Sequence, residues 1–250
     1  MEAYDSIGGG YARHRQPDGR IARAIRAAVG DVGTLVNLGA GTGSYEPNDV
    51  AVTAVEPAWR MLTQRKGRKV PAIRAVAEYL PFRDASFDVA LGVLTVHHWR
   101  DPGAGLREMV RVARERVVIL TWDPEHPGFW LTRDYFPEVL AFDRSAFPSI
   151  GDFETLLGDV RVEIVPVPAD CYDGFLGAYW RRPAEYLDPG VRQSISTFSR
   201  LATVAVGLAR LRSDLQDGTW LKRNEAIVSC EEMDLGYRLI VARGSRGADV

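Results

Sequence analysis

Short runs of apolar residues alternate with amphipathic segments along the first half of the chain. Each run is bounded by turn residues, which is typical of the buried strands of a parallel sheet. The runs are TLVNL (34–38), VAVTAV (50–55), residues 70–76, FDVALGVLTV (87–96) and RVVILTW (116–122). Strands that alternate with helices predict a parallel sheet with right-handed crossovers over residues 20–122.

Two segments carry clear helix signals, one before the first apolar run and one between the last two runs of this half. Asp18 is an expected N-cap for an amphipathic helix that Gly30 ends. Asp101-Pro102 offers a second start, with the aspartate as N-cap and the proline in the first turn. Both helices would lie on the sheet and bury their apolar sides against it.

The alternation ends after Trp122. Residues 123–150 are rich in aromatic residues and proline, VRVEIVPV (160–167) predicts a sixth strand, and GYRLIVAR (236–243) predicts a seventh. The segment 170–232 is predicted to be mainly helical and is too long for a hairpin loop. The expected fold class is therefore α/β: a Rossmann-like, mostly parallel seven-stranded sheet flanked by helices, with an inserted helical cap before the last strand.

The whole chain, 1–250, is expected to form a single domain. Residues 1–18 are polar and glycine-rich and predict an N-terminal arm. The segments 123–150 and 170–232 are expected to be cap insertions on the substrate side. A hydrophobic fraction of 46% is ordinary for a globular protein and allows a sizeable core.

Composition and charge narrow the range of partners. The formal net charge of −2 gives no reason to expect a nucleic acid, which needs a basic face. Cys171 and Cys230 lie far apart without the spacing of a zinc site or a disulfide scaffold, so we expect no metal. The sequence has no signal-peptide stretch at 1–16 and no apolar run of about 18 residues. We expect a cytoplasmic protein without a membrane partner, and the oligomeric state stays open.

The strongest chemical signal is the glycine-rich loop in VNLGAGTGSYEP (36–47). Its glycines follow a strand, where they let the backbone turn tightly and approach a ligand without a Cβ in the way. A helix is expected to follow and to present free N–H groups. Glu56 ends the next strand, where its carboxylate can accept both hydroxyls of a ribose. The alternative is a glycine-rich turn beside a solvated glutamate, which leaves the agreement of the two features unexplained.

The order of the glycines argues against a dinucleotide. Dinucleotide folds use G-x-G-x-x-G, whose third glycine lets the helix pack beneath a pyrophosphate. Here the order is G-x-G-x-G, and Ser44 stands at the third position of the longer pattern. A nicotinamide-dependent reductase, the least favoured alternative, would also need a Tyr-x-x-x-Lys pair, which none of the three lysines forms.

Three segments resemble class I S-adenosylmethionine-dependent methyltransferases, the group that includes ubiquinone and menaquinone methylases and many natural-product methylases. They are VNLGAGTGSY, VTAVEPAWRML and AEYLPFRDASFDVALGVLTVHHWRDPGAGLREMVRVAR. The LPF…SFD run is the most specific of these elements. The resemblance covers about residues 34–122. It implies S-adenosylmethionine as cofactor and methyl transfer as the reaction.

Family geometry implies cofactor contacts by position, running from the methionine part through the ribose to the adenine and the sulfonium side. They are Asn37, Gly39, Ala40, Gly41, Glu56, Pro57, Met61, Ala77, Glu78 and Leu94. Three features depart from the family pattern. Asn37 stands where an acid often precedes the glycine loop, and Val76 stands where an aspartate commonly binds the adenine. Only about seven residues separate Gly43 from the second strand, so the usual helix there is cut short.

Two adjacent histidines are the candidate catalytic residues. Methyl transfer needs an aligned acceptor and, for a hydroxyl acceptor, removal of its proton. His97 and His98 follow the fourth strand at its carboxyl end, and their titration range suits a general base. Strand alternation slightly favours His97, which would share a face with Val93 and Thr95. An equally good interpretation is that the pair only caps the strand end.

The expected acceptor is a small, aromatic or apolar molecule that is methylated at oxygen, carbon or nitrogen. Aromatic residues of the arm and of the cap would form its pocket. The candidates are Tyr4, Tyr11, Trp122, Trp130, Tyr172 and Tyr179. An alternative function is a methyltransferase fold that binds the cofactor without transferring its methyl group.

Overall fold

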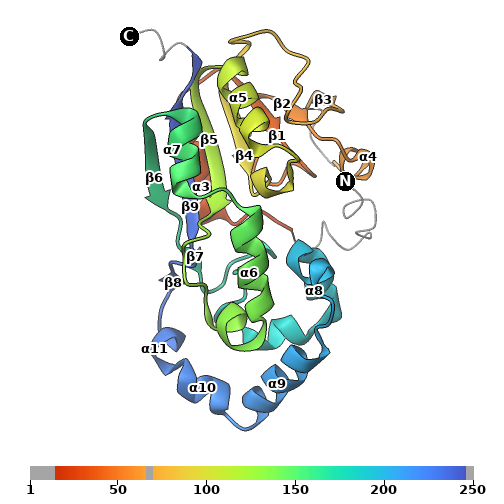
Figure 1. Cartoon of the computed structure of the whole chain (residues 1–250). Helices are drawn as coiled ribbons and strands as arrows, with labels where there is room; N and C mark the ends of the chain where they lie inside the picture. The colour runs from red at the N-terminus through yellow and green to blue at the C-terminus, as the bar shows by residue number, and fades with distance from the viewer. Residues whose placement is uncertain (1–14, 66–69, 246–250) are drawn as a thin grey trace.

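The computed structural model describes residues 15–65 and 70–245, and its centre is a seven-stranded sheet (Figure 1). The strands in spatial order are β3 (Ala72–Ile73), β2 (Ala51–Val55), β1 (Thr34–Leu38), β4 (Phe87–Val93), β5 (Ala113–Trp122), β9 (Tyr237–Arg243) and β6 (Val160–Ile164). Pairing is parallel from β3 to β5, and β9 runs antiparallel to both β5 and β6. The predicted mostly parallel sheet is confirmed.

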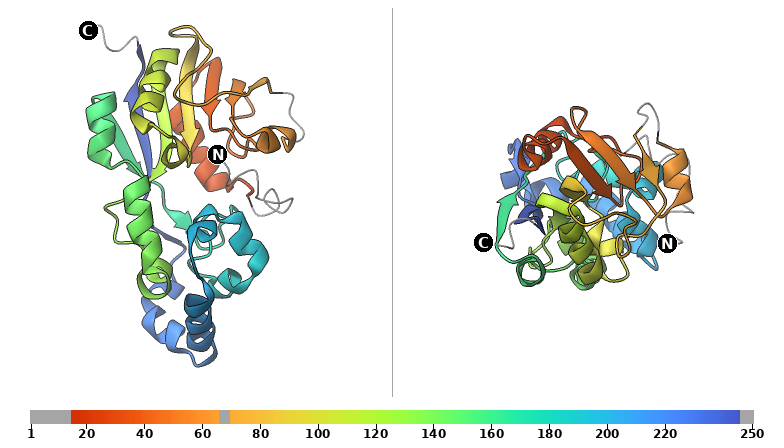
Figure 2. Two further views of the ribbon diagram at one scale, coloured as in Figure 1. Left: turned by 45° about the vertical axis from the view of Figure 1, so that its right-hand side comes forward. Right: turned by 90° about the horizontal axis from the view of Figure 1, so that it is seen from above.

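Both faces of the sheet are covered by helices, because its strands are apolar on both sides. Along β5, Val118 and Leu120 pack with α3 (Gly19–Val29), whereas Val117 and Ile119 pack with the opposite layer. That layer consists of α5 (Pro102–Val112) and α7 (Ile150–Leu157). Figure 2 shows the two layers from the side and from above.

The predicted helix starts are also confirmed. The Asp18 carboxylate accepts a hydrogen bond from the N–H of Arg20, and Gly30 ends α3 with a φ of 74°. The Asp101 carboxylate accepts from the N–H of Ala104 at the start of α5. These side chains satisfy N–H groups that a helix leaves without an internal partner.

The cap comprises residues 123–149 and 167–235, which pack together beyond the sheet (Figure 1). Its elements are the π-helical turn η2 (Leu131–Tyr135), α6 (Pro137–Ala146), η3 (Pro183–Leu187), α8 (Pro189–Ser194), η4 (Ser196–Arg200), α9 (Ala205–Gln216), α10 (Thr219–Arg223), α11 (Glu225–Val228) and a two-stranded sheet of β7 (Val167–Pro168) and β8 (Glu232–Met233). The inserted helical cap before the last strand is therefore confirmed.

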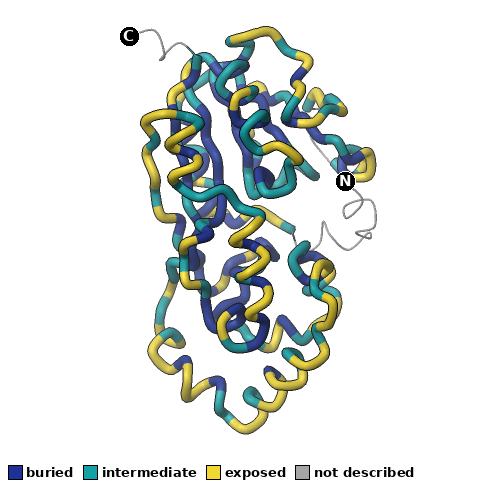
Figure 3. Tube along the Cα trace, in the orientation of Figure 1, coloured by how far each residue is buried: buried dark blue, intermediate teal, exposed yellow. Residues whose placement is uncertain are grey.

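An aromatic cluster holds the cap together. Trp130 is 2% exposed, and its indole makes edge-to-face contacts with four rings at centroid distances of 5.3 to 5.8 Å. The four rings belong to Phe129, Tyr135, Tyr186 and Trp220. Each such pair stabilises the cap by about 0.5–1.5 kcal/mol beyond burial of its area. In Figure 3, buried positions (dark blue) gather in the inner part of the cap, and exposed positions (yellow) lie along its outer helices.

Three predicted elements differ in the structure. Residues 41–50 form turns, so the helix expected directly after the glycine loop is absent from this described stretch. The segment before β2 contains Pro47 and is too short for a helix that could also reach the sheet. The strand expected over 160–167 divides into β6 and β7 around Pro166, because proline has no N–H for continued pairing. Residues 170–182 form turns rather than helix.

Candidate functional site

One cavity of about 670 Å³ lies between the carboxyl ends of the parallel strands and the cap. All ten predicted cofactor contacts line it, and so do both predicted catalytic histidines. These residues come from the end of β1 and the glycine loop, from the end of β2 and the following helix α4 (Trp59–Thr63), from the loop between β3 and β4, and from the segment that follows β4. In open α/β sheets the carboxyl ends of the strands are where ligands bind.

Glycine is required at two positions of the loop for different reasons. Gly39 has a φ of 60°, and a Cβ there would lie 1.8 Å from the Thr95 hydroxyl oxygen. Gly41 has a φ of 51°, but a Cβ there would meet no atom within 4 Å. Gly39 therefore packs against the wall of the site, whereas Gly41 borders its open space.

Glu56 lies against the glycine loop, as its place at the end of β2 predicts. One carboxylate oxygen accepts from the N–H of Gly41 at 2.9 Å, and the other accepts from the N–H of Ala58 at 2.9 Å. The side chain is 7% exposed, and burial raises the pKa of its carboxyl group despite these hydrogen bonds. A carboxylate has about four acceptor positions, so two remain for ligand hydroxyl groups.

A buried ion pair that the sequence did not reveal stabilises the glycine-rich loop. The guanidinium of Arg65 lies 2.6 Å from the carboxylate of Glu46, and it also donates to the carbonyl of Gly41 at 3.2 Å. Glu46 further accepts from the side-chain amide of Asn37 at 3.0 Å. The buried carbonyl oxygen of that amide has no hydrogen-bond partner among the described residues. Because a buried acceptor without a donor is costly, Asn37 is suited to bind a donor of the ligand.

The chain leaves β4 through a turn that sets the direction of both histidines. Leu94 adopts a left-handed backbone with a φ of 49°, and its N–H donates to the carbonyl of Leu120. Residues Val96–His98 then form the short helix η1. The strand alternation used to favour His97 therefore does not apply, because neither histidine lies in a strand.

The two histidines differ in their contacts. The ring of His97 stacks on Phe147 with centroids 3.9 Å apart, and its buried Nδ1 has no hydrogen-bond partner in the described part of the chain. The Nδ1 atom of His98 lies 3.4 Å from the Arg200 guanidinium, which is the donor because it has no acceptor atom. The predicted capping role through backbone hydrogen bonds is not seen for His97.

Burial and neighbouring positive charge keep both rings neutral. Burial, together with His98 and Arg200, lowers the pKa of His97 well below its usual value. Burial and then Arg200 lower the pKa of His98 to about 3. Because both pKa values are lowered, both rings are neutral at neutral pH. A neutral imidazole is the form that accepts a proton.

The geometry agrees with comparisons to known proteins. A family described as a methyltransferase domain matches residues 36–121. A solved structure from Anabaena variabilis, described as a methyltransferase from an antibiotic biosynthesis pathway, is 32% identical and covers 92% of this chain and 99% of its own, with a TM-score of 0.84. The chain belongs to the class I S-adenosylmethionine-dependent methyltransferases.

Two curated relatives resemble this methyltransferase over different shares of their lengths. The 27-O-demethylrifamycin SV methyltransferase of Amycolatopsis mediterranei is 27% identical over 243 residues, which are 90% of this chain and 81% of that protein. The chloroplastic 2-methyl-6-phytyl-1,4-hydroquinone methyltransferase 2 of rice is 31% identical over 124 residues. That match spans 44% of this chain but only 34% of the rice protein's length.

S-adenosylmethionine is the cofactor of this methyltransferase family, and the described site fits it. The unpartnered oxygen of Asn37 suits an ammonium donor, the space beside Gly41 admits a ligand close to the backbone, and Glu56 retains acceptor positions for hydroxyl groups. The carboxylate of Glu78 also lines the cavity, but it accepts from the N–H of Arg100 at 2.8 Å and so helps to fix the start of α5.

The predicted acceptor contacts of the methyltransferase are only partly at the cavity. Trp122 lines it, with its indole N–H donating to the carbonyl of Leu235. Trp130 and Tyr179 lie in the buried interior of the cap, and Tyr172 is 72% exposed; none of the three lines the cavity. Tyr4 and Tyr11, with most of the predicted arm, lie outside the described residues.

Other aromatic and charged side chains complete the acceptor side instead. Phe129, Phe147 and Phe175 belong to the aromatic cap segments that were expected to form the pocket, whereas Asp143 and Arg200 of the cap and Tyr237 of β9 were not predicted. The sequence offered one signal, since Asp143 directly follows the apolar run VLAF. Aromatic composition alone does not show which rings face a cavity and which form the core.

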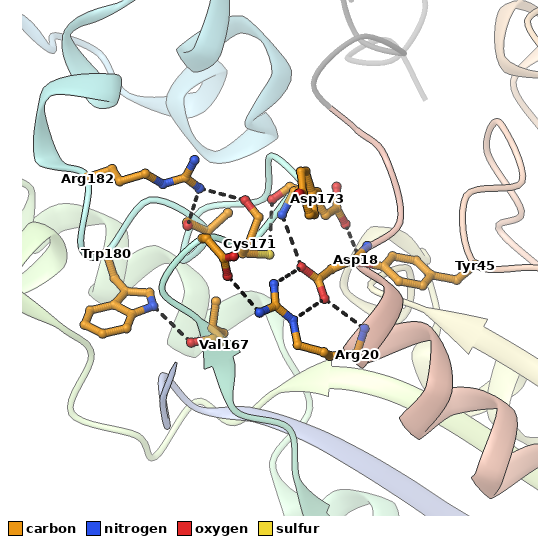
Figure 4. Close-up of polar contacts among 11 residues, drawn as sticks. Asp18, Arg20, Tyr45, Val167, Cys171, Asp173, Trp180 and Arg182 are labelled. Atoms are coloured by element: carbon orange, nitrogen blue, oxygen red, sulfur yellow. Dashed lines mark hydrogen bonds and ion pairs between the residues drawn. The ribbon is translucent and has the colours of Figure 1, made fainter. Parts of the chain in front are cut away.

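A network of buried charges joins α3, the glycine loop and the cap (Figure 4). Asp173 of the cap is 0% exposed and accepts from Arg15 at 2.7 Å and from the Tyr45 hydroxyl at 2.9 Å. Asp18 is equally buried and accepts from the Arg20 guanidinium and from the N–H of Tyr172. We call these contacts the clasp, because they connect segments about 150 residues apart in sequence.

The clasp predicts a specific acid sensitivity. Burial alone would raise the pKa of Asp18, but hydrogen bonds from Arg20 and Tyr172 lower it from 3.8 to about 2. A carboxyl group with a lowered folded pKa contributes stability above its unfolded pKa and loses it as the pH falls through the folded value. Here this contribution is on the order of 2 kcal/mol and disappears between about pH 4 and pH 2.

Asp18→Asn should therefore be less stable than the wild type at pH 6, with a difference that shrinks as the pH falls toward 2. Urea unfolding over this pH range measures the difference. Asp31→Asn is the matched control, since Asp31 is exposed just beyond the same helix. A difference that stays constant with pH would contradict the assignment of this stability to the Asp18 charge.

Among the described residues, no group of His, Cys, Asp or Glu is placed to hold a metal ion. Within residues 15–65 and 70–245, no helix has the length and apolarity needed to cross a lipid bilayer.

Proposed function

We propose that this methyltransferase transfers the methyl group of S-adenosylmethionine to a small aromatic or apolar molecule held between the sheet and the cap. The observation that carries the proposal is one cavity with two differently lined parts. The glycine loop and Glu56 line the part over the sheet, and aromatic rings line the part under the cap. The histidine pair stands in the same cavity, with His97 stacked on the cap residue Phe147.

The relatives support this acceptor class. The Amycolatopsis protein is named for a demethylrifamycin and the rice protein for a substituted hydroquinone, and both names denote ring compounds with hydroxyl groups. The cap of this chain offers a matching surface in Phe129, Phe147 and Phe175. We therefore choose 27-O-demethylrifamycin SV and 2-methyl-6-phytyl-1,4-hydroquinone as first test acceptors.

The residues of this chain align the acceptor and accept its proton. The bound cofactor supplies a methyl group that its sulfonium centre already activates. Methyl transfer requires the acceptor atom to approach the methyl carbon in line with the bond that breaks. The aromatic walls promote this alignment because they restrict how a ring can lie in the cavity. His98 is held by Arg200, whereas His97 has no such bond, so we assign proton acceptance from a hydroxyl to His97.

His97→Ala should lower the turnover number about a hundredfold with an acceptor hydroxyl, while leaving cofactor affinity unchanged. Because the pKa of His97 is lowered, the wild-type turnover number should not fall between about pH 8 and pH 6.5. Transfer of radiolabelled methyl groups measures the rate, and calorimetry measures the affinity. His98→Ala is the comparison, with a smaller loss expected.

Near-wild-type rates in both single variants and the double variant would show that catalysis here depends on alignment alone. Cofactor binding without transfer to any acceptor of the panel would instead support the alternative function, a binding protein with a methyltransferase fold. The cytoplasmic location, the absence of nucleic-acid partners and the cap boundaries at 123–150 and 170–232 stay predictions from the sequence.

A further inference from the structure

One acidic residue of the cap lies in the cavity without a hydrogen-bond donor among the described residues. Asp143 of α6 lines the cavity and is 8% exposed. No described residue donates a hydrogen bond to its carboxylate, and the only opposite charge that acts on it is the Arg200 guanidinium. A carboxylate that is largely buried and receives no hydrogen bond from the protein is costly, so a donor on a ligand in the cavity would stabilise it.

The position of Asp143 relates it directly to the reaction site. Asp143 precedes Phe147 by one helical turn, and the N–H of Phe147 donates to its carbonyl at 2.9 Å. Residues at this spacing share one side of a helix. Since the Phe147 ring stacks on His97, the Asp143 side chain belongs to the wall that faces the histidine pair.

We propose, on the basis of the proposed function, that Asp143 binds the methyl acceptor by accepting a hydrogen bond from a hydroxyl group on an otherwise apolar ring. An ionised carboxylate offers only acceptor atoms, so the ligand must supply the donor. The nearby aromatic rings favour a planar apolar body. A cationic ligand is disfavoured because Arg200 already brings a positive charge to this part of the cavity.

The ionisation of Asp143 makes the proposal sensitive to pH. Burial raises its pKa from 3.8 to about 7, against the effect of Arg200. Nearby groups are the two histidines of η1, which are neutral, and Tyr237 of β9, whose pKa is raised by burial. Arg15 also lines the cavity, and its positive charge acts on all three of these groups. The carboxylate form is therefore present above pH 7 and is lost as the pH falls below it.

Two probes that differ only at the hydroxyl test the proposal: 2-naphthol and 2-methoxynaphthalene. Calorimetry at about pH 8.5 should show that the wild type binds 2-naphthol at least about tenfold more tightly, as expected for a hydrogen bond to a charged group. At about pH 5.5 this preference should fall to a few-fold or less, although the phenolic hydroxyl, with a pKa of about 10, stays protonated at both values.

Three variants test whether the preference for the hydroxyl group depends on the Asp143 carboxylate. Asp143→Leu removes the acceptor atoms and should abolish the preference, and Asp143→Asn keeps an uncharged acceptor and should show a weaker preference that no longer depends on pH. Glu138→Gln is the matched control, because Glu138 is exposed on the same helix and should change nothing.

Equal preference in the wild type and Asp143→Leu would overturn the proposal, as would failure of 2-naphthol to bind the wild type. Each titration is repeated with S-adenosylhomocysteine. Failure of that compound to bind, with the hydroxyl preference retained, would contradict the proposed function but leave the assignment of Asp143 intact.

Discussion

Replacing Glu56 with alanine should weaken the binding of S-adenosylmethionine by about two orders of magnitude or more. Hydrogen bonds to a charged group contribute about 1.5–3 kcal/mol each, and the Glu56 carboxylate retains positions for two ligand hydroxyls. The variant also loses the acceptor for the N–H of Gly41, so the loop that borders the ligand is less firmly held. Isothermal titration calorimetry with S-adenosylhomocysteine measures the change directly.

Two further variants separate loss of binding from loss of structure. Glu56→Gln keeps one acceptor oxygen and the shape of the side chain, so its affinity should lie between those of the wild type and Glu56→Ala. Glu154→Ala, which removes an exposed carboxylate on α7, should bind normally. Unchanged affinity in Glu56→Ala, with a normal thermal unfolding curve, would refute the assignment of Glu56 to the ribose.

Gly39→Ala should destabilise the protein by roughly 2–5 kcal/mol and abolish cofactor binding. A left-handed backbone costs a non-glycine residue about 1–2 kcal/mol, and overpacking costs about 1–3 kcal/mol more. The added methyl group would lie 1.8 Å from the Thr95 hydroxyl oxygen and 2.7 Å from the Thr95 Cβ, so both the loop and the end of β4 must move. Urea unfolding of the ligand-free protein measures the loss.

Gly41→Ala is the internal control for this prediction. Its φ of 51° imposes similar backbone strain, but the added Cβ meets no atom within 4 Å. The variant should therefore lose only about 1–2 kcal/mol of stability, while its methyl group projects into the space beside the ligand and weakens binding. Equal destabilisation by the two alanines would show that the contact with Thr95 is unimportant.

The sheet and the cofactor side of the site could be predicted because their signals are local in sequence. Each strand and each helix cap spans a few residues, and Gly39 and Glu56 end consecutive strands that a parallel sheet places side by side. The acceptor side could not be predicted in this way. Asp143 and Arg200 come together only through the packing of the cap, and no periodicity reports such packing.

Two arguments from the sequence fail for the same physical reason. Trp130 was expected at the acceptor but is the centre of the cap interior, because an aromatic side chain suits either place. The argument from strand alternation for His97 assumed that the strand continued, but Leu94 turns the backbone at the end of β4, so the assignment of His97 rests on its contacts instead. Tertiary contacts determine both the place of the Trp130 ring and the path of the chain after β4. The residues next to these positions in the sequence do not show such contacts.

The antiparallel β9 has a consequence for the order in which the molecule is assembled during synthesis. Residues Tyr237–Arg243 pair with Arg116–Trp122 on one side and with Val160–Ile164 on the other. A nascent chain that has not yet emerged beyond residue 236 therefore leaves β5 as an open edge and gives β6 no partner in the sheet. Open edges pair with other chains. Strands β1 to β6 and the cap are therefore synthesised first. The sheet is completed only when the seven residues of β9 emerge and pair with both β5 and β6.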